Sequence, residues 1–206
     1  AEYYAMITHM DAQIGRVMET LKEQNQFDNT LFVFAGDNGL AVGQHGLLGK
    51  QNCYQHSVAV PLVFAGPGVP GNEQRDDLVY LFDIYPTVCA LTGVDIPDSV
   101  EGRNLLPGKK ENAAEKRDVL YFAYTGVQRA VRDDRFKLIE YAVKGRDRVT
   151  QLFDLHADPA EMNNLASDPE YAGKLQELRE KLCSCAEEWD DQKTEWGQAF
   201  WDRCTW

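Results

Sequence analysis

The chain has 206 residues, of which 44% are hydrophobic and 11% aromatic, so it is long enough to bury roughly 70% of the surface that its unfolded form exposes. Its formal net charge of -12 argues against nucleic acid and anionic lipid as partners, because clustered Lys and Arg bind those polyanions. No apolar run approaches the ~20 residues that a membrane-spanning helix needs, so we expect no membrane span.

The cysteines do not define a compartment. There are five of them, and an odd number at irregular spacing does not form a disulfide framework. The opening sequence AEYYAMITHM has neither the charged nor the apolar region of an export signal. It is typical of the interior of a helix, which predicts that the chain begins partway through a larger protein.

The first half of the chain reads as part of an α/β layer. Residues 2–24 carry apolar side chains in steps of three and four, which predicts a helix that covers a sheet. Residues 30–35 and 58–65 are apolar and β-branched, as in strands buried on both faces. A short helix around residues 54–57 between them, with a right-handed crossover, predicts parallel neighbouring strands.

A helix is predicted over residues 76–92, interrupted or restarted at Pro86 and closed by Gly93. Residues 95–117 are rich in Pro, Gly and charge, which indicates a connecting loop. We therefore predict an α/β unit over residues 1–94, this loop, and a small α+β unit over residues 118–206.

Four β patterns follow in close succession, over residues 119–124, 127–132, 136–141 and 150–155, and their spacing favours an antiparallel meander. Residues 169–189 predict a charged helix with one apolar side that packs on this sheet. The charge run over residues 132–135 is typical of a solvated turn. The tail over residues 190–206 holds three of the four Trp, which dock either on the body or on another chain.

The chemistry is concentrated just after the first predicted strand, which ends at Asp37 and Asn38. Ligands of open α/β sheets bind beyond the carboxyl ends of strands, and a carboxylate with an amide oxygen suits a hard divalent cation. The alternative is that Asn38 and Gly39 make a two-residue hairpin turn without function. The glycine-rich sequence that follows lacks the alternation of a returning strand, which favours a site.

Two further residues are candidates on the loop after Asn38. Lys50 lies twelve residues later, so its ammonium can converge with the cation site on one tetrahedral oxyanion. Taken alone it is a solvated charge. His45 is the catalytic candidate, with a loop histidine that makes only a structural hydrogen bond as the alternative.

Several separated motifs together resemble the sulfatase family. The longest runs over residues 28–69 and reads DNTLFVFAGDNGLAVGQHGLLGKQNCYQHSVAVPLVFAGPGV. It is preceded by the helix-like YYAMITHMDAQIGRVMETL and followed by DLVYLFDIYPTVCALTGV, which resembles the family pattern D-[IL]-x-P-T-[LV]. RFKLIEY and QLFDLHADPAEMNNLA resemble the family's last strands and their Asp-Pro turn.

The resemblance implies an alkaline phosphatase-like α/β sheet with flanking helices, followed by a four-stranded antiparallel sheet with a packed helix. Carried over by position, it makes Asp37 and Asn38 ligands of Ca²⁺ or Mg²⁺ and Lys50 a sulfate contact, and it places His45 in the family's loop motif. It also implies a sulfated small molecule or glycan as substrate, and by itself it favours a periplasmic or secreted location.

The chain departs from the family at the nucleophile. Sulfatases use a formylglycine made from the first residue of a C/S-x-P-x-R motif, and no such motif occurs here. Ser167 comes closest, but Tyr171 stands where Arg is required. We therefore expect a carboxyl-terminal portion of a sulfatase, with the nucleophile upstream and no turnover by this chain alone.

Two alternatives stay open. A phosphate or phosphonate ester hydrolase of the same superfamily binds a similar tetrahedral oxyanion, although Asn38 favours sulfate. A non-catalytic interaction module, which binds a partner through its acidic surface and Trp-rich tail, belongs to a different class. An uncovered sheet edge and helix face also predict that the chain self-associates.

Overall fold

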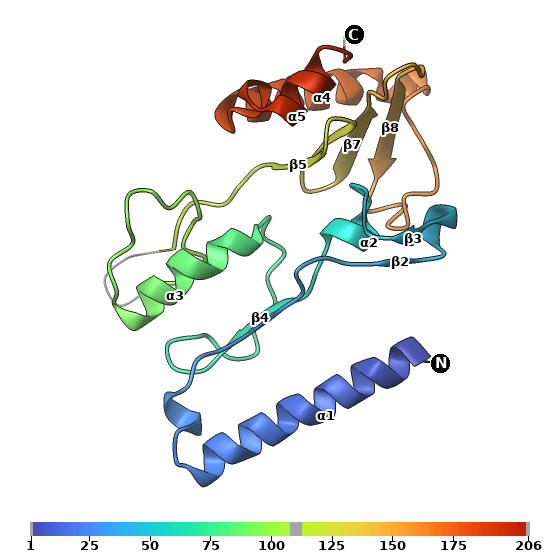
Figure 1. Ribbon diagram of the computed structural model, residues 1–206. Coiled ribbons are helices and arrows are strands. Elements are labelled where there is room, and N and C mark those ends of the chain that lie inside the picture. The colour runs from blue at the N-terminus through green and yellow to red at the C-terminus, as the bar shows by residue number, and fades with distance from the viewer. Residues whose placement is uncertain (1, 108–112, 205–206) are drawn as a thin grey trace.

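The computed structural model describes residues 2–107 and 113–204 (Figure 1). Residues 108–112 of the predicted connecting loop and Trp206 of the predicted tail lie outside this part. Between residues 95 and 117 the described part contains no helix or strand. Among the described helices, none combines the length and the apolar character that crossing a bilayer requires.

The first helix, α1 (Glu2–Glu23), has the predicted length but does not cover a sheet. None of its residues is buried, and Tyr3, Ile7 and Met10 of the predicted apolar stripe are exposed. The expected packing of this stripe on the sheet is therefore wrong for the described chain. Figure 1 shows α1 apart from the four-stranded sheet, and the apolar side chains of its stripe are exposed or only partly buried.

Strands β1 (Phe32–Ala35) and β4 (Leu62–Ala65) pair in antiparallel register, with Phe32 opposite Ala65. The predicted parallel pairing is wrong. Between the strands lie a hairpin, β2 (Ala41–Val42) with β3 (Leu48–Gly49), and the single turn of α2 (Gln55–Val58). Two parallel strands need a connection that crosses back to the other end of the sheet. Here the connection leaves the end of β1 and enters β4 at the same end of the pair, so the strands are antiparallel.

The two strands are also shorter and more exposed than predicted. Helix α2 takes up residue 58, so β4 begins only at Leu62. Phe34 is 40% exposed and Val63 53% exposed, which contradicts the expectation of strands buried on both faces. In the described part of the chain no second layer covers this two-stranded ribbon.

The predicted helix over residues 76–92 begins later, with a 3-10 turn (Leu81–Asp83) and then α3 (Ile84–Thr92). Residues 76–80 are extended. Pro86 lies in the first turn of α3, where its missing N–H removes no helical hydrogen bond. Gly93 closes the helix as predicted, in the left-handed conformation at φ 80°.

Asp83 fixes the start of α3 and the chain that follows it. Its side chain is completely buried and makes two hydrogen bonds with the guanidinium of Arg117, at 2.6 and 2.7 Å. It also accepts the backbone N–H groups of Tyr80 and Arg103. Thr87 accepts the N–H of Leu105 through its hydroxyl, so the Asp and Thr of this motif both have a structural role.

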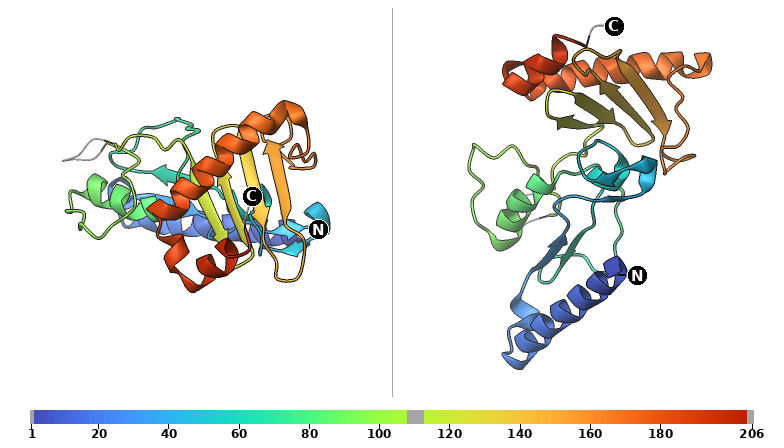
Figure 2. Two further views of the ribbon diagram at one scale, coloured as in Figure 1. Left: turned by 90° about the horizontal axis from the view of Figure 1, so that it is seen from above. Right: turned by 45° about the vertical axis from the view of Figure 1, so that its right-hand side comes forward.

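The second half contains the predicted antiparallel meander. Its strands are β5 (Leu120–Tyr124), β6 (Gln128–Arg132), β7 (Phe136–Tyr141) and β8 (Val149–Asp154), which neighbour one another in chain order. The predicted helix follows as a 3-10 turn (Pro169–Tyr171) and α4 (Ala172–Glu188), which lies across the sheet (Figure 2). This part of the fold prediction is confirmed.

Different segments cover the two faces of this sheet. On one face, strand residues such as Val131 and Leu138 pack against Leu178 and Leu182 of α4. On the other face, Ala130, Ile139 and Phe153 pack against Cys53 and Tyr54, which precede α2. The sheet is thus completed by a segment from the first half of the chain, which ties the two halves together.

The tail docks on the body of the chain through a 3-10 turn (Asp191–Lys193) and α5 (Glu195–Trp201). Asp191 receives two hydrogen bonds from Arg129 at 2.7 and 3.0 Å, and others from Tyr121 and Trp201. Burial alone would raise the pKa of Asp191, but these hydrogen bonds outweigh it and hold the pKa below its usual value.

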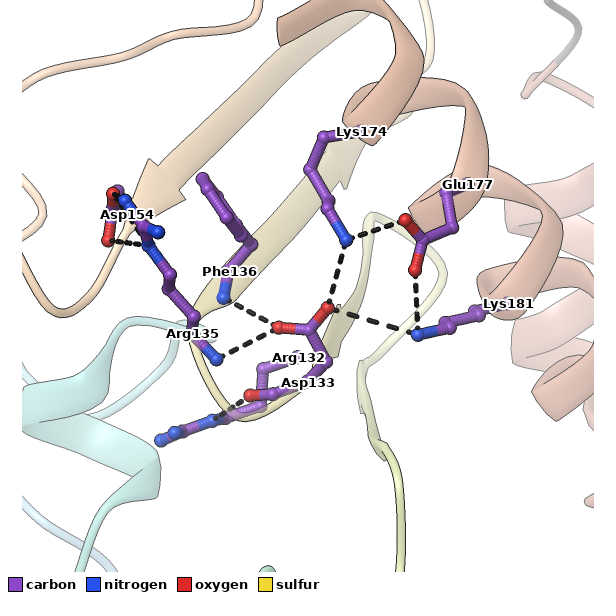
Figure 3. A network of polar contacts seen from close by, with 8 residues as sticks. All are labelled: Arg132, Asp133, Arg135, Phe136, Asp154, Lys174, Glu177 and Lys181. Carbon is purple, nitrogen blue, oxygen red and sulfur yellow. Dashed lines mark hydrogen bonds and ion pairs between the residues drawn. The ribbon is translucent and has the colours of Figure 1, made fainter.

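A second polar network joins the β6–β7 turn to α4 (Figure 3). Asp133 accepts the N–H groups of Arg135 and Phe136, which closes the turn as predicted for this charge run. Its other oxygen lies 3.6 and 3.8 Å from the ammonium groups of Lys174 and Lys181 on α4. These contacts therefore fix the position of α4 relative to the β6–β7 turn.

We expect Asp191→Asn to lower the free energy of unfolding by about 3 kcal/mol, because it leaves the buried Arg129 guanidinium without its counter-charge. Urea unfolding followed by circular dichroism measures this change. The matched control is Asp190→Asn, since Asp190 is exposed and pairs with the exposed Lys193. Equal effects of the two substitutions would show that the Arg129 pair does not hold the tail.

Candidate functional site

Asp37 and Asn38 lie directly after β1, where the backbone is fixed against the segment that leads into β4. The N–H of Gly36 donates to the carbonyl of Pro61, and that of Gly39 to the carbonyl of Ser57. A Cβ on Gly39 would lie 1.9 Å from the His56 carbonyl oxygen, so this approach requires glycine. The alternative of a hairpin turn at Asn38 and Gly39 is not observed, and the hairpin forms later, between β2 and β3.

Lys50 returns to Asn38 because β2 and β3 pair and fold the glycine-rich loop back on itself. The Lys50 Nζ donates to Asn38 Oδ1 at 2.7 Å. Asp37 Oδ1 accepts the backbone N–H of Asn38 at 2.9 Å, and the Asp37 side chain is exposed. The structure therefore brings these three predicted site residues together.

His45 lies elsewhere on the same loop. Its ring stacks on Tyr54 at 4.0 Å between centroids, and its Nε2 lies 3.1 Å from the carbonyl oxygen of Ala160. It does not line the cavity that contains Asp37, Asn38 and Lys50. Its contacts agree with the structural alternative, and its catalytic role stays a prediction.

A cavity of about 790 Å³ opens beside Asn38 and Lys50. Residues from both halves of the chain line it: Asp37, Asn38, Lys50 and Gln55 from the first half, and Arg132 and His156 from the second. Small-molecule sites have volumes of roughly 300–1,000 Å³. The cavity is thus large enough for a sugar-sized molecule next to the predicted site.

Sequence reasoning missed the second wall of this cavity. Arg132 belongs to the charge run that predicts a solvated turn, but its side chain is only half exposed and lines the cavity. The signal that could have identified it is the alternation of β6, which places Arg132 on the same face as Ala130 and Gln128. That face is covered by the segment before α2.

A buried ion pair holds the cavity wall in place. The ammonium of Lys137 lies 2.9 Å from Glu161 Oε1, and both side chains are almost completely buried. Lys137 also donates to the side chain of Gln55, and the backbone N–H of Gln55 donates to Glu161 at 2.6 Å. Gln55 lines the cavity, so this pair positions the wall that α2 contributes. Burial lowers the pKa of Lys137, while Glu161 favours its charged form.

Asp37 and Asn38 suit a hard cation as part of a ligand shell. Both present oxygen, the donor that Ca²⁺ and Mg²⁺ take, and in this structure one lone pair of Asn38 Oδ1 accepts the hydrogen bond of Lys50. Over residues 2–107 and 113–204 no group of three or more His, Cys, Asp or Glu is placed to hold a metal ion.

Comparison with known proteins identifies the class to which this fold and cavity belong. Residues 43–188 match the family described as "N-sulphoglucosamine sulphohydrolase, C-terminal". The chain belongs to this family of sulfatases, within the alkaline phosphatase-like superfamily. The family and the fold predicted from the sequence motifs are thereby confirmed.

Individual relatives agree with this assignment. The arylsulfatase of Clostridium perfringens is 33% identical over 189 residues, which cover 88% of this chain and 39% of the relative. Arylsulfatase K of Canis lupus familiaris is 32% identical over 193 residues, which cover 87% of this chain and 36% of the relative. The chain thus spans about two fifths of the length of these relatives.

Solved structures match over most of the chain. One, a protein in complex with its substrate D-glucosamine-2-N,6-O-disulfate, has a TM-score of 0.75 and 26% identity and covers 93% of this chain and 40% of its own. The phosphonate monoester hydrolase of Agrobacterium radiobacter has a TM-score of 0.78 and 31% identity. The match covers 90% of this chain and 40% of the hydrolase.

We expect Lys137→Met to lower the free energy of unfolding by about 3 kcal/mol, because Glu161 would remain as an unpaired buried charge. Adding Glu161→Gln should recover part of this loss, since the double variant has no buried charge at this position. Urea unfolding of the two single variants and the double variant measures the coupling. Lys144→Met, at an exposed position, is the control. A double variant with simply additive losses would contradict a paired role.

Proposed function

We propose that this chain contributes the cation and sulfate contacts of a metal-dependent sulfatase, a hydrolase of sulfuric esters. The single observation that carries the proposal is the hydrogen bond of 2.7 Å between Lys50 Nζ and Asn38 Oδ1, beside Asp37 and at the edge of a cavity. Family membership supports the reaction class. In this proposal Asp37 and Asn38 bind the metal and Lys50 binds the sulfate.

The ion in this proposal is Ca²⁺, with Mg²⁺ as the alternative, held in part by the Asp37 carboxylate and the Asn38 amide oxygen. When bound, such an ion polarises an ester oxygen and stabilises negative charge that develops on it. Lys50 acts on the same oxyanion, because a fixed ammonium at a partly enclosed site stabilises developing charge without reorganising. Asn38 orients that ammonium by accepting its hydrogen bond.

The proposed substrate is a sulfated small molecule or glycan. The cavity volume of about 790 Å³ suits a molecule of this size. A structural neighbour with a TM-score of 0.75 binds D-glucosamine-2-N,6-O-disulfate, which supports a sulfated sugar.

The nucleophile in this proposal comes from outside the 206 residues, because the sequence has no C/S-x-P-x-R motif. His45 is retained as the proposed general acid or base of the loop, although it does not line the cavity.

A phosphate or phosphonate ester hydrolase is the second candidate, since the phosphonate monoester hydrolase of Agrobacterium radiobacter has a similar fold. A non-catalytic module is the third, and the acidic composition supports it.

The exposed apolar side chains of α1 and β1, among them Tyr4, Met6 and Phe34, support the proposed self-association of the chain.

We expect weak calcium binding, with a dissociation constant of roughly 10⁻⁴–10⁻³ M, because two protein ligands leave most of the shell to water. Isothermal titration calorimetry should show that Asp37→Ala abolishes it. Asp28→Ala, at an exposed aspartate in the turn after α1, should bind as the unaltered chain does. Micromolar binding that survives Asp37→Ala would remove Asp37 and Asn38 from the proposal, and a pure interaction module should ignore calcium altogether.

We also expect that the purified 206-residue chain hydrolyses no aryl sulfate, because the sequence contains no formylglycine precursor motif. Release of the phenol, followed by absorbance with and without calcium, measures this. A complete sulfatase assayed in parallel confirms that the conditions support turnover. Turnover by the chain above the buffer rate would mean that it contains its own nucleophile.

A further inference from the structure

A second cationic side chain, that of Arg132 in the α+β unit, lines the cavity beside Lys50. Among the described residues that line it, Lys50 and Arg132 are the two that carry a permanent positive charge. Lys50 follows β3 in the first half of the chain, and Arg132 ends β6 in the second half. The two residues therefore line one cavity, which is open to solvent, from different units of the fold.

In the described part of the chain Arg132 makes no direct ion pair, although the negative charges of Asp134, Asp133 and Glu161 act on it from further away. Its Nε donates to the carbonyl of Asp133 at 3.1 Å, and its Nη2 to the carbonyl of Asp134 at 3.3 Å. Figure 3 shows the side chain extending away from α4 toward the ribbon of α2. Burial lowers the pKa of Arg132, which reflects partial loss of solvation that an anionic ligand would compensate.

Two other arginines of the same sheet, unlike Arg132, make direct hydrogen bonds with a carboxylate. Arg129, on the opposite face of β6, makes two hydrogen bonds with Asp191, and Arg135 makes bonds of 3.0 and 3.1 Å with Asp154. These side chains already have anionic partners, so they hold the fold together. Arg132 is held by backbone carbonyls and has capacity to bind an anion from the cavity.

The cavity does not attract anions through its overall charge. Asp37, Asp76, Asp77 and Asp134 also line it. Asp77 pairs with Arg75 and Lys116, but Asp76 and Asp134 are exposed carboxylates. An anionic ligand must therefore be held by direct contacts, and Lys50 and Arg132 are the cationic side chains that line the cavity among the described residues.

We propose that Arg132 determines substrate specificity by binding a second sulfate group, so that the site prefers a sugar with two sulfates over a sugar with one. This inference rests on the proposed function, in which Lys50 binds the sulfate of the ester to be cleaved. The planar guanidinium matches two oxygens of a sulfate group at once, as it does for other tetrahedral oxyanions. Arg132 takes no part in bond cleavage in this proposal.

The test compares two ligands by isothermal titration calorimetry at low ionic strength in the presence of calcium: D-glucosamine-2-N,6-O-disulfate and D-glucosamine-6-O-sulfate. We expect the unaltered chain to bind the disulfate about tenfold more tightly, as one charge-assisted contact of this kind provides. Arg132→Gln should remove this preference by weakening disulfate binding, while monosulfate binding changes less than about twofold.

Two further variants separate specificity from folding. Arg132→Lys keeps the charge but loses the planar pair of donors, so it should retain part of the preference. Arg146→Gln removes one positive charge from the exposed β7–β8 turn and should behave as the unaltered chain does. Unfolding curves for all variants show whether each is folded at the temperature of the titration.

The outcomes for Lys50 and Arg132 are distinguishable. Lys50→Ala should weaken both ligands, and if it weakens neither, the proposed function fails at this residue. If Lys50→Ala weakens both ligands but Arg132→Gln leaves their ratio unchanged, the specificity inference alone is overturned. Equal weakening of both ligands in Arg132→Gln also overturns it, as does failure of the unaltered chain to bind the disulfate at millimolar concentration.

Discussion

The arrangement of this protein depends on how one face of the β5–β8 sheet is covered. Helix α4 covers the opposite face in the usual way, but on this face the cover is the irregular segment before α2. An irregular segment brings polar backbone groups with it, and these need partners when buried. Gln128 accepts the backbone N–H of Cys53 and Glu161 accepts that of Gln55. Lys137 pairs with Glu161 and donates to the Gln55 side chain, so the same contacts fix the cavity wall.

Ion pairs with at least one almost fully buried side chain recur from the start of α3 to the tail, and each one joins segments far apart in the sequence. They are Asp83 with Arg117, Arg129 with Asp191, Lys137 with Glu161, and Glu140 with Arg179. Burying two charges costs about as much as their attraction returns. Such pairs therefore add little net stability. If a loop or the tail packed on the sheet in another position, a buried charge would remain unpaired, so the pairs favour one arrangement of these segments.

The elements that the sequence predicts correctly are those whose local pattern agrees with their surroundings. The meander follows from four closely spaced β patterns and α4 from a helical apolar stripe, because α4 packs that stripe on the sheet. The pairing of β1 with β4 does not follow from pattern, since an apolar strand has the same composition in either direction. Its direction depends on the path of the intervening loop.

The residues of the candidate site also fall into those that the sequence predicts and those that it does not. Asp37, Asn38 and Lys50 can be identified from the sequence, because a strand end, a glycine-rich loop and a lysine follow one another between residues 37 and 50. Arg132 is not identified in this way. Alternation along β6 gives its face of the sheet, but it comes from a distant strand and lies within a run of charge that is typical of a solvated turn. Only the tertiary structure places its guanidinium in that cavity, since the covering of one sheet face by a distant segment is a long-range packing event that no local pattern records.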